Sequence, residues 1–264
     1  YAQRITLEMA ALLFRLQAAS EGRLKVVRTA SELESCISSG VMSAIMHCEG
    51  AEAIDPAFDA LEVLYQAGLR SLGPVWSRAN IFGEGVPFRN PSPDTGPGLT
   101  ALGRDLVRAC NRLRIMIDLS HMNEKSFWDV AALSDAPLVA THSNAHALCP
   151  TSRNLTDRQL DAIKESDGMV GVNFGVHFLR TGGDPAMPVE AITEHIDYLV
   201  ERLGIDRVGF GSDFDGTVIP TALGDVTGLP PLLTALSQRG YDEVSLRKLA
   251  HENWVRVLRA TWGA

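Results

Sequence analysis

Two short apolar runs in the sequence each end on a histidine. Residues 115–120 lead to His121, and residues 137–141 lead to His142. Runs of this length and composition are typical of buried strands in a parallel sheet. In α/β folds, ligands bind at the C-terminal ends of such strands. The two histidines therefore predict a metal site.

Two acidic residues occupy equivalent positions after other apolar runs. Glu49 follows residues 41–48, and Asp213 follows residues 207–211. Two imidazoles and one carboxylate form a three-ligand set with an open position for water, which is typical of a catalytic zinc site. Asp213 is then placed to move protons. One such residue alone is more often a hydrogen-bonding or capping group, but four at strand ends favour a metal site.

Other polar residues are weaker candidates. His47 lies two residues before Glu49 and so shares its strand face, which makes it either a pocket residue or an ordinary half-buried histidine. We expect Asp118 to be a buried hydrogen-bonding partner, and His195 and His251 to be surface or interhelical residues. The four scattered cysteines predict free, mostly buried thiols rather than disulfides or a thiolate metal site.

Alternating helical and strand patterns place these candidates in an α/β fold. Six strands are predicted near residues 41–48, 69–76, 114–120, 137–141, 168–174 and 207–211. Strict alternation implies a parallel sheet. A chain of 264 residues suits a single (β/α)8 TIM-type barrel domain over residues 1–264. Since a complete barrel has eight strands, we expect the first two βα units to be missing from this sequence.

Helix boundaries and one long loop complete the predicted layout. The sequence predicts an opening helix over residues 1–19, a helix that begins at Ser31 and ends at Gly40, and a helix that begins at Asp55-Pro56. Residues 77–98 are rich in Gly, Pro, Asn and Asp and show little periodicity. A loop of that length is often part of an active-site rim.

Charge and hydropathy limit the partners of the protein. The net charge of −8 and the pI near 5.4 argue against nucleic acid or an anionic membrane as a partner, because both attract basic surfaces. No apolar segment is long enough to span a bilayer, and no signal-peptide cleavage pattern is found. We therefore expect a cytoplasmic protein that acts on a small molecule.

Several runs at compatible spacing resemble the renal (membrane) dipeptidase family, in a bacterial-type form. The matching runs are Glu49-Gly50, Gly98-Leu99-Thr100, Leu102-Gly103, Ile117-Asp118-Leu119-Ser120-His121, Thr141-His142-Ser143-Asn144-Ala145, Ser152-Arg153-Asn154, Val172-Asn173-Phe174 and Gly209-Phe210-Gly211-Ser212-Asp213-Phe214-Asp215-Gly216. The family consists of zinc dipeptidases of the amidohydrolase superfamily. The resemblance implies an amidohydrolase-type barrel.

The resemblance also implies roles for the candidate residues. Glu49 would bridge two zinc ions, and His121 and His142 would complete the ligands of the second ion. Asp213 would accept a proton from the bridging hydroxide and return it to the leaving amine. Arg153 would hold the C-terminal carboxylate of the substrate through a charge-assisted fork.

Two departures from the family pattern affect this interpretation. The family's first strand carries a His-x-Asp pair that binds the other zinc, and no such pair precedes Glu49 here. Trp76 stands where the renal enzyme has a histidine that contacts the substrate carbonyl. The first departure agrees with the low strand count, and the second indicates an altered substrate preference.

The sequence therefore predicts a zinc-dependent dipeptidase that cleaves dipeptides with a free C-terminal carboxylate through a metal-bound hydroxide. One alternative is a related amidohydrolase that acts on N-acyl amino acids or other small amides. Another is a metal-depleted member that acts as a binding module without catalysis. The expected partner is a small carboxylate-bearing substrate, with no nucleic acid and no membrane. Self-association as a homodimer is left open.

Overall fold

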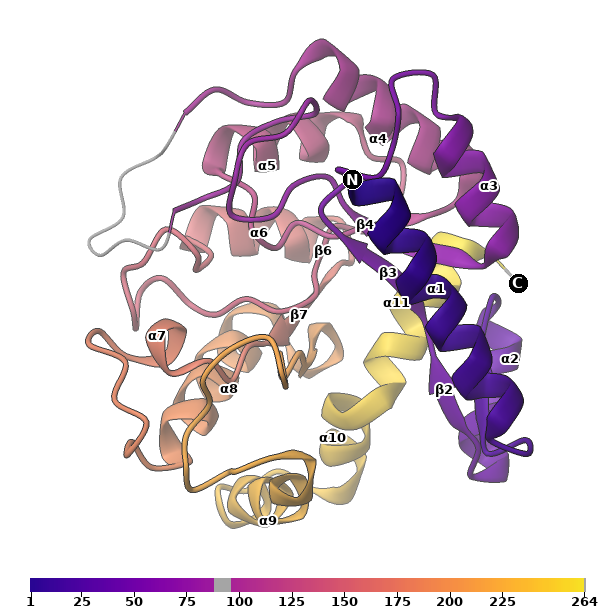
Figure 1. Cartoon of the computed structure of the whole chain (residues 1–264). Helices are drawn as coiled ribbons and strands as arrows, with labels where there is room; N and C mark the ends of the chain where they lie inside the picture. Colours follow the sequence, from indigo (N-terminus) through magenta and orange to yellow (C-terminus); the bar gives the residue numbers. More distant parts are fainter. Residues whose placement is uncertain (88–95, 264) are drawn as a thin grey trace. The chain divides into compact units, whose positions relative to one another are not determined.

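The computed structural model describes residues 1–87 and 96–263, which divide into two compact units (Figure 1). Unit 1 runs over Tyr1–Gly85 and Gly96–Ala136 and includes the residues from Leu258 onward. Unit 2 runs over Pro137–Val257, together with residues 86 and 87. Residues 88–95 of the predicted long loop lie outside the described part of the chain. Each unit is an α/β assembly with its own parallel strands.

Unit 1 has two parallel sheets. The first pairs β1 (Leu24–Val26) with β2 (Met42–Ala44), and the second has the order β3 (Met46–Glu49), β4 (Leu69–Gly73), β5 (Met116–Ile117). In the second sheet Glu49 lies opposite Gly73. Because the strands are parallel, their C-terminal ends lie at one edge, where Glu49 is the last strand residue.

One helix of unit 1 precedes its first strand, and each of the others comes after a strand. They are α1 (Ala2–Ala19), α2 (Ala30–Ser39), α3 (Asp59–Ala67), α4 (Ala101–Leu113) and α5 (Glu124–Leu133). Helix α11 (Asn253–Trp262) contributes residues to both units, because its residues up to Val257 belong to unit 2. The predicted bounds of α1 are confirmed within one residue.

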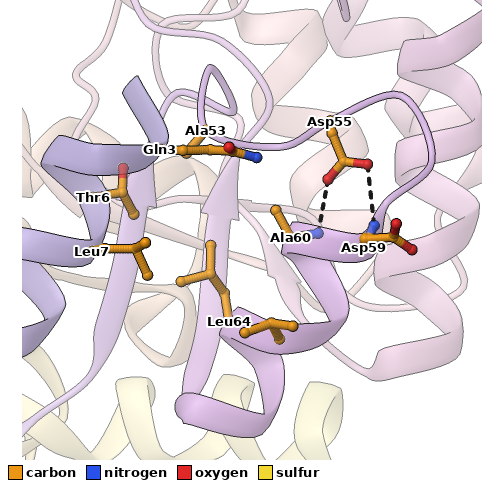
Figure 2. A pocket seen from close by; sticks show the side chains of 9 residues that line it. Gln3, Thr6, Leu7, Ala53, Asp55, Asp59, Ala60 and Leu64 are labelled. Atoms are coloured by element: carbon orange, nitrogen blue, oxygen red, sulfur yellow. Dashed lines mark hydrogen bonds between the residues drawn. The ribbon is translucent and has the colours of Figure 1, made fainter. Parts of the chain in front are cut away.

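Two predicted helix starts in unit 1 were wrong because side chains cap at other positions. Helix α2 is capped by Thr29, whose hydroxyl accepts a hydrogen bond from the Glu32 N–H at 3.1 Å, and not by Ser31. Helix α3 begins at Asp59 rather than at Asp55. Figure 2 shows the Asp55 carboxylate directed at this helix start, where it accepts from the N–H groups of Asp59 at 3.3 Å and Ala60 at 2.8 Å. The acidic residue caps the helix from outside.

Unit 2 has one parallel sheet. Its order is β6 (Val139–Ala140), β7 (Met169–Val172), β8 (Val208–Phe210), with Val172 opposite Phe210. Its helices are α6 (Asp157–Glu165), α7 (Val176–Leu179), α8 (Glu190–Leu203), α9 (Leu229–Gln238) and α10 (Glu243–Arg247), and a π-helical turn (Lys248–Glu252) joins α10 to α11. Helices α6 and α8 pack together against β7 (Figure 1).

The predicted parallel pairing of strands is confirmed, but the predicted number of strands is not. The described residues contain eight strands, because the predicted strand over 41–48 is interrupted at Ile45 and β1 was missed altogether. Strand β1 is only three residues long and carries Lys25 at its centre, so it shows no apolar run. The predicted count of six strands was therefore too low. The single closed barrel stays a prediction.

The thiols behave as the sequence predicts within the described residues. All four cysteines are free; Cys36, Cys110 and Cys149 are buried and Cys48 is half-buried. Burial raises the pKa of Cys110 to about 12 and that of Cys48 to about 11, so both thiols stay protonated near neutral pH. A search of the described helices found none with the length and apolar character required to cross a bilayer.

Candidate functional site

In unit 1 the structure brings Glu49 and His121 together. The Glu49 carboxylate ends β3, and His121 lies four residues beyond β5. His121 Nε2 is 2.9 Å from Glu49 Oε1. The His121 side chain is 5% exposed, whereas that of Glu49 is 42% exposed. A buried imidazole thus faces a carboxylate that is open to solvent, as expected where an ion enters from one side.

The second ring nitrogen of His121 is contacted by the loop after β4. Ser77 Oγ lies 2.8 Å from His121 Nδ1, and the Trp76 ring lies 5.8 Å from the imidazole ring. If Nδ1 carries the proton and donates a hydrogen bond to Ser77 Oγ, the lone pair of Nε2 is directed toward Glu49. Metal-binding histidines are usually oriented in this way by a partner on the second ring nitrogen. His121 also has a φ of 68°, a conformation that strains a side-chain-bearing residue.

A polar group and a cleft lie beside this pair in unit 1. Asp118 is 1% exposed, and its Oδ1 accepts from the Ser120 N–H at 2.9 Å, which confirms its predicted role as a buried hydrogen-bonding partner. His47 Nδ1 is 2.8 Å from Ser71 Oγ. His47 and Glu49 both line a cleft of about 620 Å³ against α1. His47 is therefore a pocket residue, one of the two roles considered for it.

In unit 2, His142 directly follows Thr141 at the end of the β6 segment. Thr141 Oγ1 lies 2.6 Å from His142 Nδ1, so this ring is also contacted by a hydroxyl at Nδ1, which directs Nε2 away. The carbonyl of His142 accepts from Arg153 Nη2 at 2.8 Å, and Ser143 Oγ accepts from Arg153 Nη1 at 2.8 Å. The backbone and the imidazole of His142 are therefore both held.

Arg153 is buried, and its guanidinium plane is fixed. It is 4% exposed, and its charge lies 5.5 Å from the centre of the Phe178 ring, within the range of a cation–π contact. The sequence predicts a carboxylate-binding role for this residue. A guanidinium has five N–H donors in one plane, and the bonds to the His142 segment set the direction of that plane.

Asp213 follows β8 and is held by an asparagine from the neighbouring strand. Asn173 follows β7, and its Nδ2 donates to Asp213 Oδ2 at 2.9 Å. Asp213 has a φ of 60°, so it shares the left-handed backbone conformation of His121. Two of the predicted site residues thus have strained backbones, a property that clusters at functional sites.

His195 takes the interhelical one of its two predicted roles and is almost fully buried. It is 1% exposed in α8, where its Nδ1 accepts from the Ala145 N–H at 3.2 Å and its Nε2 lies 2.9 Å from the Leu179 carbonyl. Burial lowers the pKa of His195, so the neutral ring links α8 to the loop after His142. This loop is therefore anchored to the unit 2 core.

Ser77, Thr141 and Asn173 were given no role from the sequence. Thr141 and Asn173 fall within the motifs, next to His142 and at a strand end, so their positions could have suggested partners. Ser77 is 44 residues from His121 and only the fold brings it to the ring.

The residues fit a divalent transition metal. The donor types are two imidazole nitrogens and one carboxylate oxygen, which such ions prefer. Each imidazole has a hydroxyl at Nδ1 within its own unit, the arrangement in which a histidine binds a metal through Nε2. The chemistry of these donors therefore suits such an ion.

The chain is similar to known proteins over nearly its whole length. A family model described as membrane dipeptidase (peptidase family M19) matches residues 1–262. A crystal structure of a metallo peptidase from Rhodobacter sphaeroides, liganded with a phosphinate mimic of the dipeptide L-Ala-D-Ala, is 59% identical with a TM-score of 0.97, over 99% of this chain and 75% of that one.

Two further proteins are similar to this chain in sequence. An uncharacterized protein in the pqqA 5′ region of Klebsiella pneumoniae is 52% identical over 96% of this chain and 94% of its own length. Dipeptidase tcpJ of Claviceps purpurea is 30% identical over 97% of this chain, which spans 60% of that protein.

Proposed function

We propose that this chain, which belongs to the membrane dipeptidase family, peptidase family M19, is a zinc-dependent dipeptidase built on an amidohydrolase-type barrel. Its substrates would be dipeptides with a free C-terminal carboxylate. The observation that carries the proposal is the pair of Glu49 and His121, 2.9 Å apart at the C-terminal ends of parallel strands. Ser77 contacts the second ring nitrogen of this histidine.

The proposed metal ligands are Glu49 and His121 of unit 1 and His142 of unit 2. Each lies at or just beyond the end of a strand in its own unit. Both histidines carry a hydroxyl partner at Nδ1, so both would bind through Nε2. In the family pattern these three residues would hold one of two zinc ions.

Asp213 and Arg153 would handle the substrate. A zinc ion, when bound, supplies an acidified water and polarises the scissile carbonyl. The Asp213 carboxylate would accept the proton that the attacking water loses and return it to the leaving amine nitrogen. The Arg153 guanidinium, fixed by Ser143 and the His142 carbonyl, would hold the substrate carboxylate.

The substrate class can be narrowed by one property of a relative. The Rhodobacter sphaeroides enzyme was crystallised with a mimic of L-Ala-D-Ala, so a D-residue at the C-terminal position is the first choice to test. Trp76 packs against His121 where the renal family has a histidine, and we propose that it alters side-chain preference. An N-acyl amino acid also offers a carboxylate to Arg153.

The test is metal content together with dipeptide turnover by the purified chain. We expect at least one equivalent of zinc, hydrolysis of L-Ala-D-Ala, and loss of turnover after chelation that zinc restores. Acetyl-D-Ala in the same panel distinguishes the amidohydrolase alternative. A chain that is folded and zinc-free, and that cleaves no member of the panel, would contradict the proposed function and favour a non-enzymatic binding module.

A further inference from the structure

Asn173 connects the ends of the unit 2 strands. It directly follows β7, the central strand of the sheet, and is 0% exposed. Its Nδ2 donates to Asp213 Oδ2 at 2.9 Å on the β8 side. The same nitrogen is 3.4 Å from the His142 carbonyl on the β6 side. One buried amide therefore reaches both neighbouring strand ends.

The orientation of the Asn173 amide is fixed by its other contacts. Its Oδ1 accepts from the Gly175 N–H at 2.6 Å, and only an oxygen can accept there, so the NH₂ group must face Asp213. Asn144 holds the Asn173 backbone on both sides: Asn144 Oδ1 accepts from the Asn173 N–H at 3.0 Å, and Asn144 Nδ2 donates to the Asn173 carbonyl at 2.9 Å. The Nδ2–H group of Asn173 that donates to Asp213 is therefore held in a fixed position.

The two oxygens of Asp213 have different surroundings. Oδ2 is held by Asn173. Oδ1 lies over Gly216, where an added Cβ would approach it to 2.2 Å, so the glycine leaves room for this oxygen. A carboxylate held at one oxygen cannot rotate freely, and the other oxygen keeps one direction.

We infer that Asn173 is a positioning residue for Asp213. The Nδ2–H group of Asn173 fixes Asp213 Oδ2, so that Asp213 Oδ1 carries the proton in peptide hydrolysis. This inference rests on the proposed function. Oδ1 would take one proton from the attacking water and give it to the amine nitrogen as the C–N bond breaks. Asn173 itself neither gains nor loses a proton.

Two substitutions of Asn173 distinguish the effect of its N–H donor from the effect of its side-chain shape. Asn173→Ala removes the donor and the acceptor. Asn173→Asp keeps the shape and the acceptor for Gly175 but presents an oxygen to Asp213. We expect kcat for L-Ala-D-Ala to fall about 10- to 100-fold in Asn173→Ala and at least as far in Asn173→Asp, with KM and zinc content little changed.

Asn253 offers a matched control at the opposite end of β8. It is 3% exposed, and its Nδ2 donates to the carbonyls of Ile205 at 2.6 Å and Val208 at 2.7 Å. Asn253→Ala therefore measures what loss of a buried amide costs the fold. We expect it to lower the melting temperature while kcat stays near that of the parent protein.

The outcomes distinguish this inference from the proposed function. Parental kcat in folded Asn173→Asp, or equal losses of kcat in Asn173→Ala and Asn253→Ala, would overturn the positioning role while leaving the dipeptidase intact. A parent protein without zinc or turnover would overturn the proposed function, and the inference with it. If Asn173→Ala does not fold, the isosteric Asn173→Asp decides.

Discussion

His121 in unit 1 and His142 in unit 2 each have a hydroxyl at Nδ1, but the hydroxyl comes from a different kind of place in the chain. Each has a hydroxyl at Nδ1, at 2.8 Å from Ser77 and at 2.6 Å from Thr141. The unit 1 hydroxyl comes from a loop 44 residues away, whereas the unit 2 hydroxyl is the preceding residue. One histidine therefore depends on loop packing and the other on its own strand end.

The comparison first predicts that the two histidines are equally necessary. His121→Ala and His142→Ala should each reduce kcat/KM by more than about 100-fold, because removal of a ligand should cost more than loss of its hydrogen-bonding partner. Activity and zinc per chain, measured by elemental analysis, check this. If His142→Ala keeps full zinc and activity, unit 2 contributes no ligand.

The second prediction concerns the hydroxyls. Ser77→Ala and Thr141→Val should each weaken zinc affinity by about 10- to 100-fold, because the ring loses the partner that fixes its tautomer. Competition with a chromogenic chelator measures the affinity. Melting curves of the zinc-free variants serve as controls for folding. Unchanged affinity in both variants would mean that ring packing alone sets the orientation.

The third prediction is a pH dependence specific to unit 2. Burial lowers the pKa of His195 below its ordinary value of 6.5. Below pH 6.5 His195 is protonated in the unfolded chain but stays neutral in the folded chain. The contribution of His195 to the free energy of unfolding is therefore complete above pH 6.5, and it falls as the pH falls toward the folded-state pKa. The slope is at most about 1.4 kcal/mol per pH unit.

Denaturant unfolding at pH 7.5 and pH 5.5 measures this effect. His195→Gln should reduce the difference in unfolding free energy between the two pH values. Hydrogen exchange should localise the effect to the Ala145 N–H, which donates to His195, and spare the Asp118 N–H of unit 1, which donates to the Leu72 carbonyl. Equal acceleration of exchange at both amides would contradict a local origin.

The smallest expected effect is at a helix start in unit 1. Thr100 Oγ1 accepts from the Gly103 N–H at 3.0 Å and caps α4. Thr100→Ala should cost about 1 kcal/mol of stability without changing zinc affinity, in contrast to Ser77→Ala. Denaturant unfolding and zinc titration check the two parts. A loss of zinc affinity in Thr100→Ala would show that the effect of Ser77→Ala is not specific to His121.

The sequence predicts the ends of strands better than their lengths. The run before His121 reads as seven strand residues, but only Met116 and Ile117 form ladder pairs, because the chain turns toward the left-handed His121. The meeting of Glu49 with His121 was nevertheless predictable, since parallel strands end at one edge. Ser77 was not predictable, because its approach depends on the path of the loop after β4.

The motifs also contain residues whose role is structural. Thr100 and Gly103 belong to the runs that resemble the dipeptidase family, and the structure assigns them to the start of α4. An added Cβ at Gly103 would lie 2.0 Å from the Phe82 carbonyl, so close packing requires the glycine. A motif alone does not separate such residues from ligands; hydrogen-bond partners do.

The left-handed backbone at His121 and Asp213 has a consequence for protein engineering. At φ values of 68° and 60°, glycine or asparagine would relieve strain. A redesign that optimises thermal stability alone would therefore select these two positions among the first to replace, and would remove the proposed metal ligand and the proposed proton carrier together. Any stabilised variant of this enzyme should hold both positions fixed and seek its gains elsewhere.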